Sequence, residues 1–288
     1  MTEGVSFSGM AELPVVVVYG QRPGPATGLP TYTAQGDLEF LLHAGHGEFV
    51  RFIVAPGDAE EAYFLSCLAM NLAWKYQIPA FILSDKHLCE GIFSFDNQII
   101  PKIQEMVLSP SQKEGYKRYE ETPSGVSPLA FPPLKGSVIK ANSYEHDEAG
   151  ITIEEAQLSR KMAEKRLRKE KGLLEEIEKL SSVKVSGNKE SSCAILCWGS
   201  NKGVCKEVAF RLNLKVVQPQ ILSPFPIQSF QESMKDVKKV ICVECNARGQ
   251  LAHLVEAFGF RVDSRILKYD GRPFTVEELE AEVKKVMV

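Results

Sequence analysis

Residues 50–83 read VRFIVAPGDAEEAYFLSCLAMNLAWKYQIPAFIL, which is two mainly apolar runs separated by one helical pattern. Residues 50–54 and 80–83 are short and apolar, as is typical of buried strands. Between them Asp58 is a favourable N-cap and Glu61 follows three residues later, so a capping box begins the helix. Pro79 ends the helical pattern. The alternation of buried strands and helices predicts an α/β fold with mostly parallel sheets.

The same alternation extends toward both ends of the chain. Four consecutive valines, Val15–Val18, together with Tyr19 form another continuous apolar run and predict a buried strand. A second α/β unit begins near Ser192. The other expected elements are a helix at 1–11, strands at 194–198 and 240–243, a helix at 202–212, and a last helix from the capping box of Thr275 and Glu278 to about Val286.

Between the two units the pattern changes twice. Residues 101–150 contain prolines and glycines that interrupt regular structure, which predicts a linker or a loop that wraps a neighbour. Residues 152–180 predict a highly charged helix with a narrow apolar stripe. Its alternating charges indicate a face exposed to solvent. Contact with nucleic acid is the weaker alternative, because glutamates offset the lysines and arginines.

The composition of the chain excludes several classes of protein. The 288 residues carry 34 Lys and Arg against 37 Asp and Glu, a net charge of −3, which argues against a broad basic surface for nucleic acid. No apolar run approaches the roughly 20 residues that cross a bilayer, so no membrane span is expected. The start, MTEG, is not that of a signal peptide, and seven cysteines are an odd count. We therefore expect a reduced, cytoplasmic protein.

The stretch from Gln21 to Asp37 follows directly on the expected strand at 15–19. Open α/β sheets bind ligands at the carboxyl ends of their strands, so this loop is a candidate site. Its prolines and glycines restrict the backbone path. The side chains that offer a cation, hydroxyls and an amide are Arg22, Thr27, Thr31, Thr33 and Gln35. They suit an anionic or carbonyl-bearing small molecule, although a polar surface loop explains the same residues equally well.

Motifs along nearly the whole chain resemble, in order, those of one enzyme family. They are QRPGPATGLPT at 21–31, QGDL at 35–38, HAGHGE at 43–48, APG at 55–57, LSD at 83–85, YKRY at 116–119, EHDE at 145–148, WGS at 198–200, PFP at 224–226, NARGQL at 246–251 and YDGRPF at 269–274. Together these motifs resemble the α subunit of the 2-oxoacid:ferredoxin oxidoreductases.

The resemblance implies a subunit of a thiamine-diphosphate enzyme. It implies a partial pyrimidine-type thiamine-diphosphate domain at 1–105, a linker and charged helix at 106–190, and a transketolase-C-terminal-like domain at 191–288. A partner β subunit would hold the diphosphate side of the cofactor, Mg²⁺ and an iron–sulfur cluster. The enzyme would oxidatively decarboxylate a 2-oxoacid such as pyruvate or 2-oxoglutarate, with coenzyme A accepting the acyl group and ferredoxin the electrons.

The resemblance also indicates, by position, which residues line the thiazolium and the substrate mouth. These expected cofactor-binding residues are Arg22, Thr27, Thr31 and Gln35. Their role would be to orient the substrate and to stabilise developing negative charge. The family's glutamate that activates the aminopyrimidine belongs upstream of the matching segment, so the chain is expected to be N-terminally truncated and no catalytic residue is assigned. We expect the isolated chain to be inactive; the alternative is a noncatalytic scaffold or partner-binding fragment.

Three other groups of residues are weaker candidates for a site. Cys242 and Cys245 are spaced like some metal or redox pairs, but they fall on a strand and at its end, where core filling is more typical. Residues 199–203 lie between a strand and a helix and could hold a phosphate, although an ordinary turn is favoured. His43 and His46 have no evident third ligand, so no metal is expected.

Overall fold

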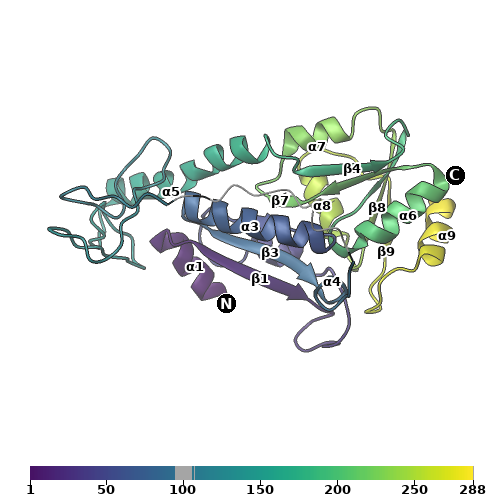
Figure 1. The fold of residues 1–288 in the computed structure, drawn as a ribbon, viewed down its shortest axis with the longest axis horizontal. Coiled ribbons are helices and arrows are strands. Elements are labelled where there is room, and N and C mark those ends of the chain that lie inside the picture. Colours follow the sequence, from purple (N-terminus) through teal and green to yellow (C-terminus); the bar gives the residue numbers. More distant parts are fainter. Residues whose placement is uncertain (95–105, 107, 288) are drawn as a thin grey trace.

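The chain folds into two α/β units that lie side by side (Figure 1). The computed structural model describes residues 1–94, 106 and 108–287. The helices are α1 (Thr2–Ala11), α2 (Leu38–Leu42), α3 (Ala59–Tyr76), α4 (Lys86–Cys89), α5 (Ala156–Ile177), α6 (Lys202–Leu212), α7 (Ile227–Ser233), α8 (Gln250–Ala257) and α9 (Val276–Met287), with a short 3₁₀ turn at Gly199–Asn201. The strands are β1 (Val15–Gln21), β2 (Phe52–Val54), β3 (Pro79–Asp85), β4 (Val183–Gly187), β5 (Cys193–Leu196), β6 (Lys215–Pro219), β7 (Ile221–Ser223), β8 (Lys239–Glu244) and β9 (Ser264–Leu267). No helix in the described ranges combines the length and apolar character that a bilayer crossing requires.

The first sheet has the strand order β1-β3-β2-β7. β1 and β2 both pair with β3 in parallel, whereas β7 runs antiparallel to β2. Residues of α3 and of the C-terminal half of α5 cover one face, and residues of α1 and α2 cover the other. Both faces of β2 and β3 are therefore buried, whereas β1 at the edge of the sheet is partly exposed. This arrangement confirms the predicted α/β fold.

The second sheet has the strand order β4-β6-β5-β8-β9. Its strands are parallel except for β4, which pairs antiparallel with β6 at one edge. α6 and α9 cover one face. The other face packs under α7 and α8 and shares a single apolar core with α1 and α2 of the first unit. The two units are thus joined by a common core as well as by the chain.

Two strands lie across the expected domain limits. β4 falls in the expected linker range of 106–190 but belongs to the second sheet, and β7 falls in the range 191–288 but pairs with β2 of the first sheet. The antiparallel pair places Ile53 opposite Ser223 and Val54 opposite Ile221. The second unit therefore supplies an edge strand to the first.

Residues 108–155, here called the strap, wrap the end of the first unit that lies farthest from the second (Figure 1). The strap contains an isolated bridge between His146 and Thr152 but, where it is described, no helix or strand. Arg118 is buried and donates a hydrogen bond to Gln77 Oε1 at 2.8 Å and to the Glu12 carbonyl at 2.6 Å. The prediction of an irregular, wrapping segment is confirmed for the described part of the strap.

The charged helix α5 is less exposed than its sequence suggests. Lys165 and Lys169, one turn apart, are 0% and 2% exposed, and their Nζ atoms lie 2.7 and 2.6 Å from the carboxylate of Glu12. Glu12 follows α1 in the left-handed conformation, with φ of 51°, and is fully buried. The prediction of a solvent-exposed charged face is wrong here, because α5 packs this side against the end of α1 and pairs both charges.

The two expected capping boxes begin α3 and α9. The Glu61 N–H donates to Asp58 Oδ1 at 2.9 Å, and the Glu278 N–H donates to Thr275 Oγ1 at 3.2 Å. Glu278 completes its box by accepting from the Thr275 N–H at 3.1 Å. Glu61 differs from the expected pattern, because its Oε2 accepts from the Gly57 N–H at 2.7 Å instead of from Asp58. This exchange points the Glu61 carboxylate toward the second unit.

Candidate functional site

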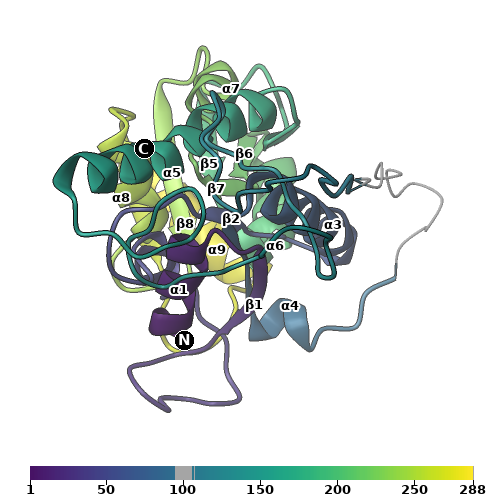
Figure 2. The same cartoon turned by 90° about the vertical axis from the view of Figure 1, so that its left-hand side faces the viewer.

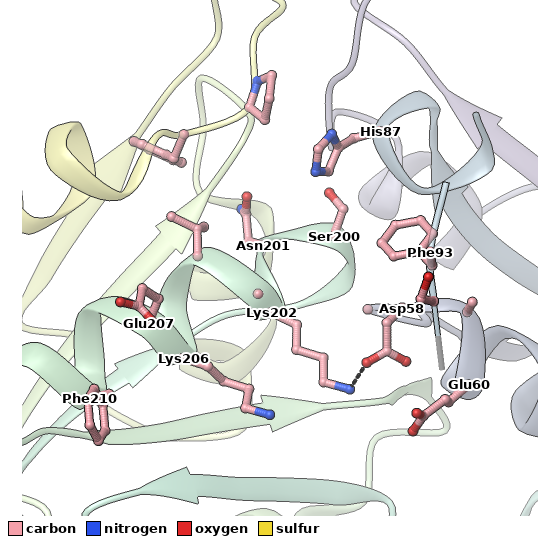
Figure 3. Close-up of a pocket in the computed structure, with 17 residues that line it drawn as sticks. Asp58, Glu60, His87, Phe93, Ser200, Asn201, Lys202, Lys206, Glu207 and Phe210 are labelled. Atoms are coloured by element: carbon pink, nitrogen blue, oxygen red, sulfur yellow. Dashed lines mark hydrogen bonds and ion pairs between the residues drawn. The ribbon is translucent and has the colours of Figure 1, made fainter. Parts of the chain in front are cut away.

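The carboxyl ends of both sheets open onto one cleft of about 580 Å³ (Figure 3). Residues 57–60 follow β2, His87 follows β3, and residues 200–202 follow β5. Pro273 and Phe274 come from the segment after β9. Strand ends are the usual ligand-binding position in α/β proteins, because their loops bring polar side chains and helix N-termini together. The cleft is therefore the candidate site.

One wall of the cleft is an ion-pair cluster that ties the two units together. Lys202 Nζ on α6 pairs with Asp58 (Figure 3). The same Nζ lies 2.6 Å from Glu61 Oε1. Burial lowers the pKa of Lys202. The hydrogen bonds to Asp58 and Glu61 raise it by more than burial lowers it, so the pKa of Lys202 lies above its ordinary value. The Gln218 amide also donates to Glu61 Oε2 at 2.9 Å. Lys202 thus links the two units through ion pairs.

The open part of the cleft carries groups of both charges. Lys206 and Glu207 reach it from α6, and Glu60 reaches it from α3 (Figure 3). Phe93 and Phe210 add apolar surface, and Phe210 is 81% exposed. The mixture suits a ligand with polar and apolar parts better than a small anion alone. Sequence reasoning missed these residues; it named only the adjacent stretch 199–203, of which residues 200–203 also line the cleft, as a weak phosphate candidate.

The loop between β1 and α2 projects beyond the body of the protein at the same end of the first sheet (Figures 1 and 2). The side chains of Arg22, Thr27 and Thr31 are exposed on it. Its C-terminal part docks on the second unit, where the Thr33 N–H donates to the Gly271 carbonyl at 3.2 Å. The structure thus brings three of the four predicted cofactor contacts together on one exposed loop.

Gln35, the fourth predicted contact, lies elsewhere. Its side chain is fully buried between the units. Its Nε2 donates to the Trp198 carbonyl at 2.8 Å, and its Oε1 accepts from Asn201 Nδ2 at 2.7 Å and from the Cys245 N–H at 3.0 Å. The polar atoms of Gln35 are therefore engaged within the protein. Contact between Gln35 and a cofactor stays a prediction, and the geometry supports a role in holding the loop.

Glu244, at the end of β8, organises the neighbouring strand-to-helix connection. Its carboxylate is fully buried. The groups that donate to it are Trp198 Nε1 at 3.1 Å, Asn246 Nδ2 at 2.8 Å, the N–H groups of Leu251 at 2.9 Å and Ala252 at 3.1 Å, and the Cys242 thiol at 3.4 Å. A carboxylate at the first turn of α8 satisfies N–H groups that have no partner within the helix. It thereby fixes the loop that faces Gln35.

Replacing Glu244 by glutamine is expected to lower the free energy of unfolding by about 2 kcal/mol. The new amide group is a donor and must point at one of the existing donors, which loses its acceptor. Urea denaturation of the full chain measures the change. Glu256→Gln on α8, the helix whose first turn Glu244 contacts, is the matched control: Glu256 forms a partly exposed ion pair with Arg265, so its loss should cost less than about 1 kcal/mol. Equal effects of the two substitutions would contradict this role for Glu244.

The cysteine and histidine pairs show no ligand arrangement. Cys242 and Cys245 are free and buried, and burial raises the pKa of both thiols, that of Cys245 to about 12. The structure supports the core-filling interpretation of these residues. His46 Nδ1 lies 3.2 Å from Ser6 Oγ. Across the described ranges, no group of three or more His, Cys, Asp or Glu side chains is placed to hold a metal ion.

Comparison with known proteins identifies the family. The model of the pyruvate flavodoxin/ferredoxin oxidoreductase, thiamine diphosphate-binding family matches residues 1–165, more than half of the chain. The chain belongs to this family. The resemblance seen in the motifs, and the thiamine-diphosphate-binding fold that it implied, are thereby confirmed.

Relatives of known function extend the match to the whole chain. The 2-oxoacid:ferredoxin oxidoreductase α subunit of Saccharolobus solfataricus is 37% identical over 100% of this chain and 47% of its own length. The KorA subunit of 2-oxoglutarate synthase from Methanocaldococcus jannaschii is 28% identical over 98% of this chain and 76% of its own length. This member of the family thus spans about half the length of the 2-oxoacid:ferredoxin oxidoreductase α subunits it matches.

A solved structure shares the same arrangement of both units. It is a 2-oxoglutarate:ferredoxin oxidoreductase from Magnetococcus marinus with 2-oxoglutarate, coenzyme A and succinyl-CoA bound. The TM-score is 0.86 at 31% sequence identity, and the match covers 99% of this chain and 50% of the other. The packing of the two sheets around the cleft therefore follows that of a family member.

Proposed function

We propose that the chain is part of the α subunit of a thiamine-diphosphate-dependent 2-oxoacid:ferredoxin oxidoreductase and forms one wall of its cofactor site. The observation that carries the proposal is the exposed loop of Arg22, Thr27 and Thr31 at the carboxyl end of β1, in a chain of a thiamine diphosphate-binding family. These three side chains form no hydrogen bond with the described part of the chain, so their polar groups are available to a ligand.

The residue types on the loop fit the chemistry of a 2-oxoacid. A guanidinium binds a carboxylate through parallel hydrogen bonds, so Arg22 would orient the substrate's carboxylate. The hydroxyls of Thr27 and Thr31 would donate to an oxygen that gains negative charge. Thiamine diphosphate, when bound, supplies the nucleophilic carbon that attacks the 2-oxo group. Gln35 would act indirectly, by holding the base of the loop against the second unit.

The proposal includes partners for the other half of the site. A β subunit would hold the diphosphate side with Mg²⁺ and an iron–sulfur cluster in a hetero-oligomer, and coenzyme A and ferredoxin would be co-substrates. The family and the names of the relatives as α subunits support a partner β subunit and thiamine diphosphate as the cofactor. The ranges 1–105, 106–190 and 191–288 are proposed as its pyrimidine-type, linker and transketolase-C-terminal-like parts. All seven cysteines are free, which supports a cytoplasmic location.

The test is an assay of acyl-CoA formation from pyruvate or 2-oxoglutarate with coenzyme A and ferredoxin. We expect no turnover by the isolated chain and turnover by the chain assembled with its native partners. In that assembly Arg22→Ala should lower kcat/KM by roughly 10²-fold, as removal of a charge-stabilising donor does. Arg261→Ala is the control, because Arg261 is 83% exposed at the opposite end of the second sheet. Turnover by the isolated chain, or equal activity of both variants, would refute the proposal.

A further inference from the structure

The loop between β1 and α2 takes a compact shape through its own backbone. The Leu29 N–H donates to the Pro23 carbonyl at 3.0 Å, and the Tyr32 N–H donates to the Leu29 carbonyl at 3.2 Å. These bonds bring together Pro23 and Tyr32, here called the anchor residues. Arg22 directly precedes the first anchor and Thr31 directly precedes the second. The placement of these two proposed substrate contacts therefore depends on where the anchor residues are held.

Gly271 of the second unit lies against both anchor residues. It is buried and has a positive φ of 82°. A methyl group on its Cα would lie 3.2 Å from Tyr32 Cβ and 3.5 Å from Pro23 Cγ. The same methyl group would lie 3.0 Å from Leu29 Cδ1. Glycine alone combines this backbone conformation with so close an approach, so the loop packs directly on the backbone of the second unit.

Two further contacts hold the loop on the same segment. The Thr33 N–H donates to the Gly271 carbonyl at 3.2 Å. The guanidinium carbon of Arg272 lies 3.9 Å from the centre of the Tyr32 ring, which is the geometry of a cation–π contact. Packing, a hydrogen bond and a cation–π contact therefore converge on the part of the loop that directly follows Thr31.

The segment that contacts the loop is itself anchored in the second unit. Residues 269–274, here called the clamp, lie between β9 and α9 (Figure 1). Phe274 packs in the core beneath α6 and α9. The Arg272 N–H donates to Asp270 Oδ1 at 2.9 Å, and the Asp270 carboxylate lies 3.0 Å from Lys268 Nζ. The clamp is thus a fixed support for the loop.

We propose that Gly271 and Arg272 are positioning residues for the substrate-binding side chains of the loop. By holding the anchor residues, the clamp would keep Arg22 and Thr31 in the arrangement that a 2-oxoacid requires. A misplacement of about 1 Å can cost roughly 10²-fold in rate, so such a support matters to the reaction without touching the substrate. This inference rests on the proposed function. It assigns the clamp a role distinct from that of Gln35, which holds the base of the loop.

The first test measures the clamp without turnover, by hydrogen exchange of the backbone amides of the full chain. In Gly271→Ala the added methyl group must displace the anchor residues. The amides of Leu29, Tyr32 and Thr33 should then exchange at least about 10-fold faster. Gly259→Ala is the matched control, because Gly259 also has a positive φ, of 84°. A methyl group there would meet nothing within 4 Å in the described part of the chain beyond its sequence neighbours. Equal exchange of the loop in the two variants would overturn the inference.

Arg272→Gln tests the clamp with little risk to folding, because Arg272 is exposed. The substitution removes the cation from the face of the Tyr32 ring, so the Thr33 amide should exchange roughly threefold faster. Tyr32→Phe is the conservative variant: it keeps the ring face and should leave this exchange unchanged. Unchanged exchange in Arg272→Gln would refute the role of Arg272.

The second test uses the enzyme assembled with its native partners. Gly271→Ala should lower kcat/KM for the 2-oxoacid by roughly 10-fold or more and leave the KM for coenzyme A unchanged. In an Arg22→Ala background the same substitution should have a much smaller effect, because the group that the clamp positions is gone. Additive losses in the double variant would indicate a merely structural role and overturn the inference. Faster exchange in Gly271→Ala beside full activity of Arg22→Ala would leave the contact of the clamp with the loop in place and refute only the proposed function.

Discussion

Replacing Glu12 by glutamine is expected to lower the free energy of unfolding by about 3–5 kcal/mol, the cost of removing one partner from a buried ion pair. Glu12 is fully buried and pairs with Lys165 and Lys169, which are also buried. Glutamine has nearly the same shape but no charge. Two ammonium groups would then remain in the interior without a counter-charge. Chemical denaturation of the full chain, followed by circular dichroism, measures the loss.

The same cluster is expected to make the free energy of unfolding depend on pH in the acidic range. Burial raises the pKa of the Glu12 carboxyl, but the charges of Lys169 and Lys165 outweigh this effect. The pKa of Glu12 therefore falls from its ordinary 4.5 to about 2. Between these values the unfolded chain binds more protons than the folded one. The contribution of Glu12 is therefore complete above pH 4.5 and is lost as the pH falls toward 2. The Glu12→Gln variant should lack this part of the pH dependence.

Glu164→Gln is the matched control on α5. Glu164 pairs with Arg160 on the exposed side of the helix, where both side chains are more than half exposed. Loss of such a pair typically costs less than about 1 kcal/mol. If Glu12→Gln costs no more than Glu164→Gln, the buried cluster does not hold the end of α1 against α5.

Gln35→Ala should have the second largest effect, a loss of about 3 kcal/mol in the free energy of unfolding. The substitution removes the side-chain partner of the buried Trp198 carbonyl and of the Cys245 N–H, and it leaves the Asn201 amide only a long hydrogen bond of 3.5 Å to the Val243 carbonyl. Each orphaned group costs about 1–3 kcal/mol, less what an entering water restores. Urea denaturation monitored by tryptophan fluorescence suits this variant, because Trp198 lies at the affected contact.

Thr31→Ala on the same loop separates stability from ligand contact. Thr31 is exposed, so its loss should change the free energy of unfolding by less than about 0.5 kcal/mol. In the assembled enzyme the same variant should lower turnover. The opposite result, a stable Gln35→Ala protein beside a destabilised Thr31→Ala protein, would show that the roles of the two residues are reversed.

Local sequence patterns were sufficient for most of the helices and strands. The apolar run at 15–19 lies within β1, the capping residues Asp58 and Thr275 stand where α3 and α9 begin, and the helix expected at 202–212 is α6. The strap was predicted from its prolines and glycines. These features are recognisable because periodicity, capping and proline act over a few neighbouring residues.

The candidate site was only partly predictable. The loop of Arg22, Thr27 and Thr31 could be located because it follows a buried strand and carries family motifs. The buried position of Gln35 could not, because its partners Trp198 and Asn201 lie more than 160 residues away in the chain. The cleft residues Lys206 and Glu207 were missed for the same reason, since the two sheets meet only in the folded chain.

The family, the α/β class and the order of the strands and helices follow from residue patterns alone, since each depends on neighbours in the chain or on short sequence motifs. Whether an individual charged side chain is buried or exposed, and which group it pairs with, depends on tertiary packing. Glu12 and Lys165 are 153 residues apart, and neither their burial nor their pairing leaves a local signal.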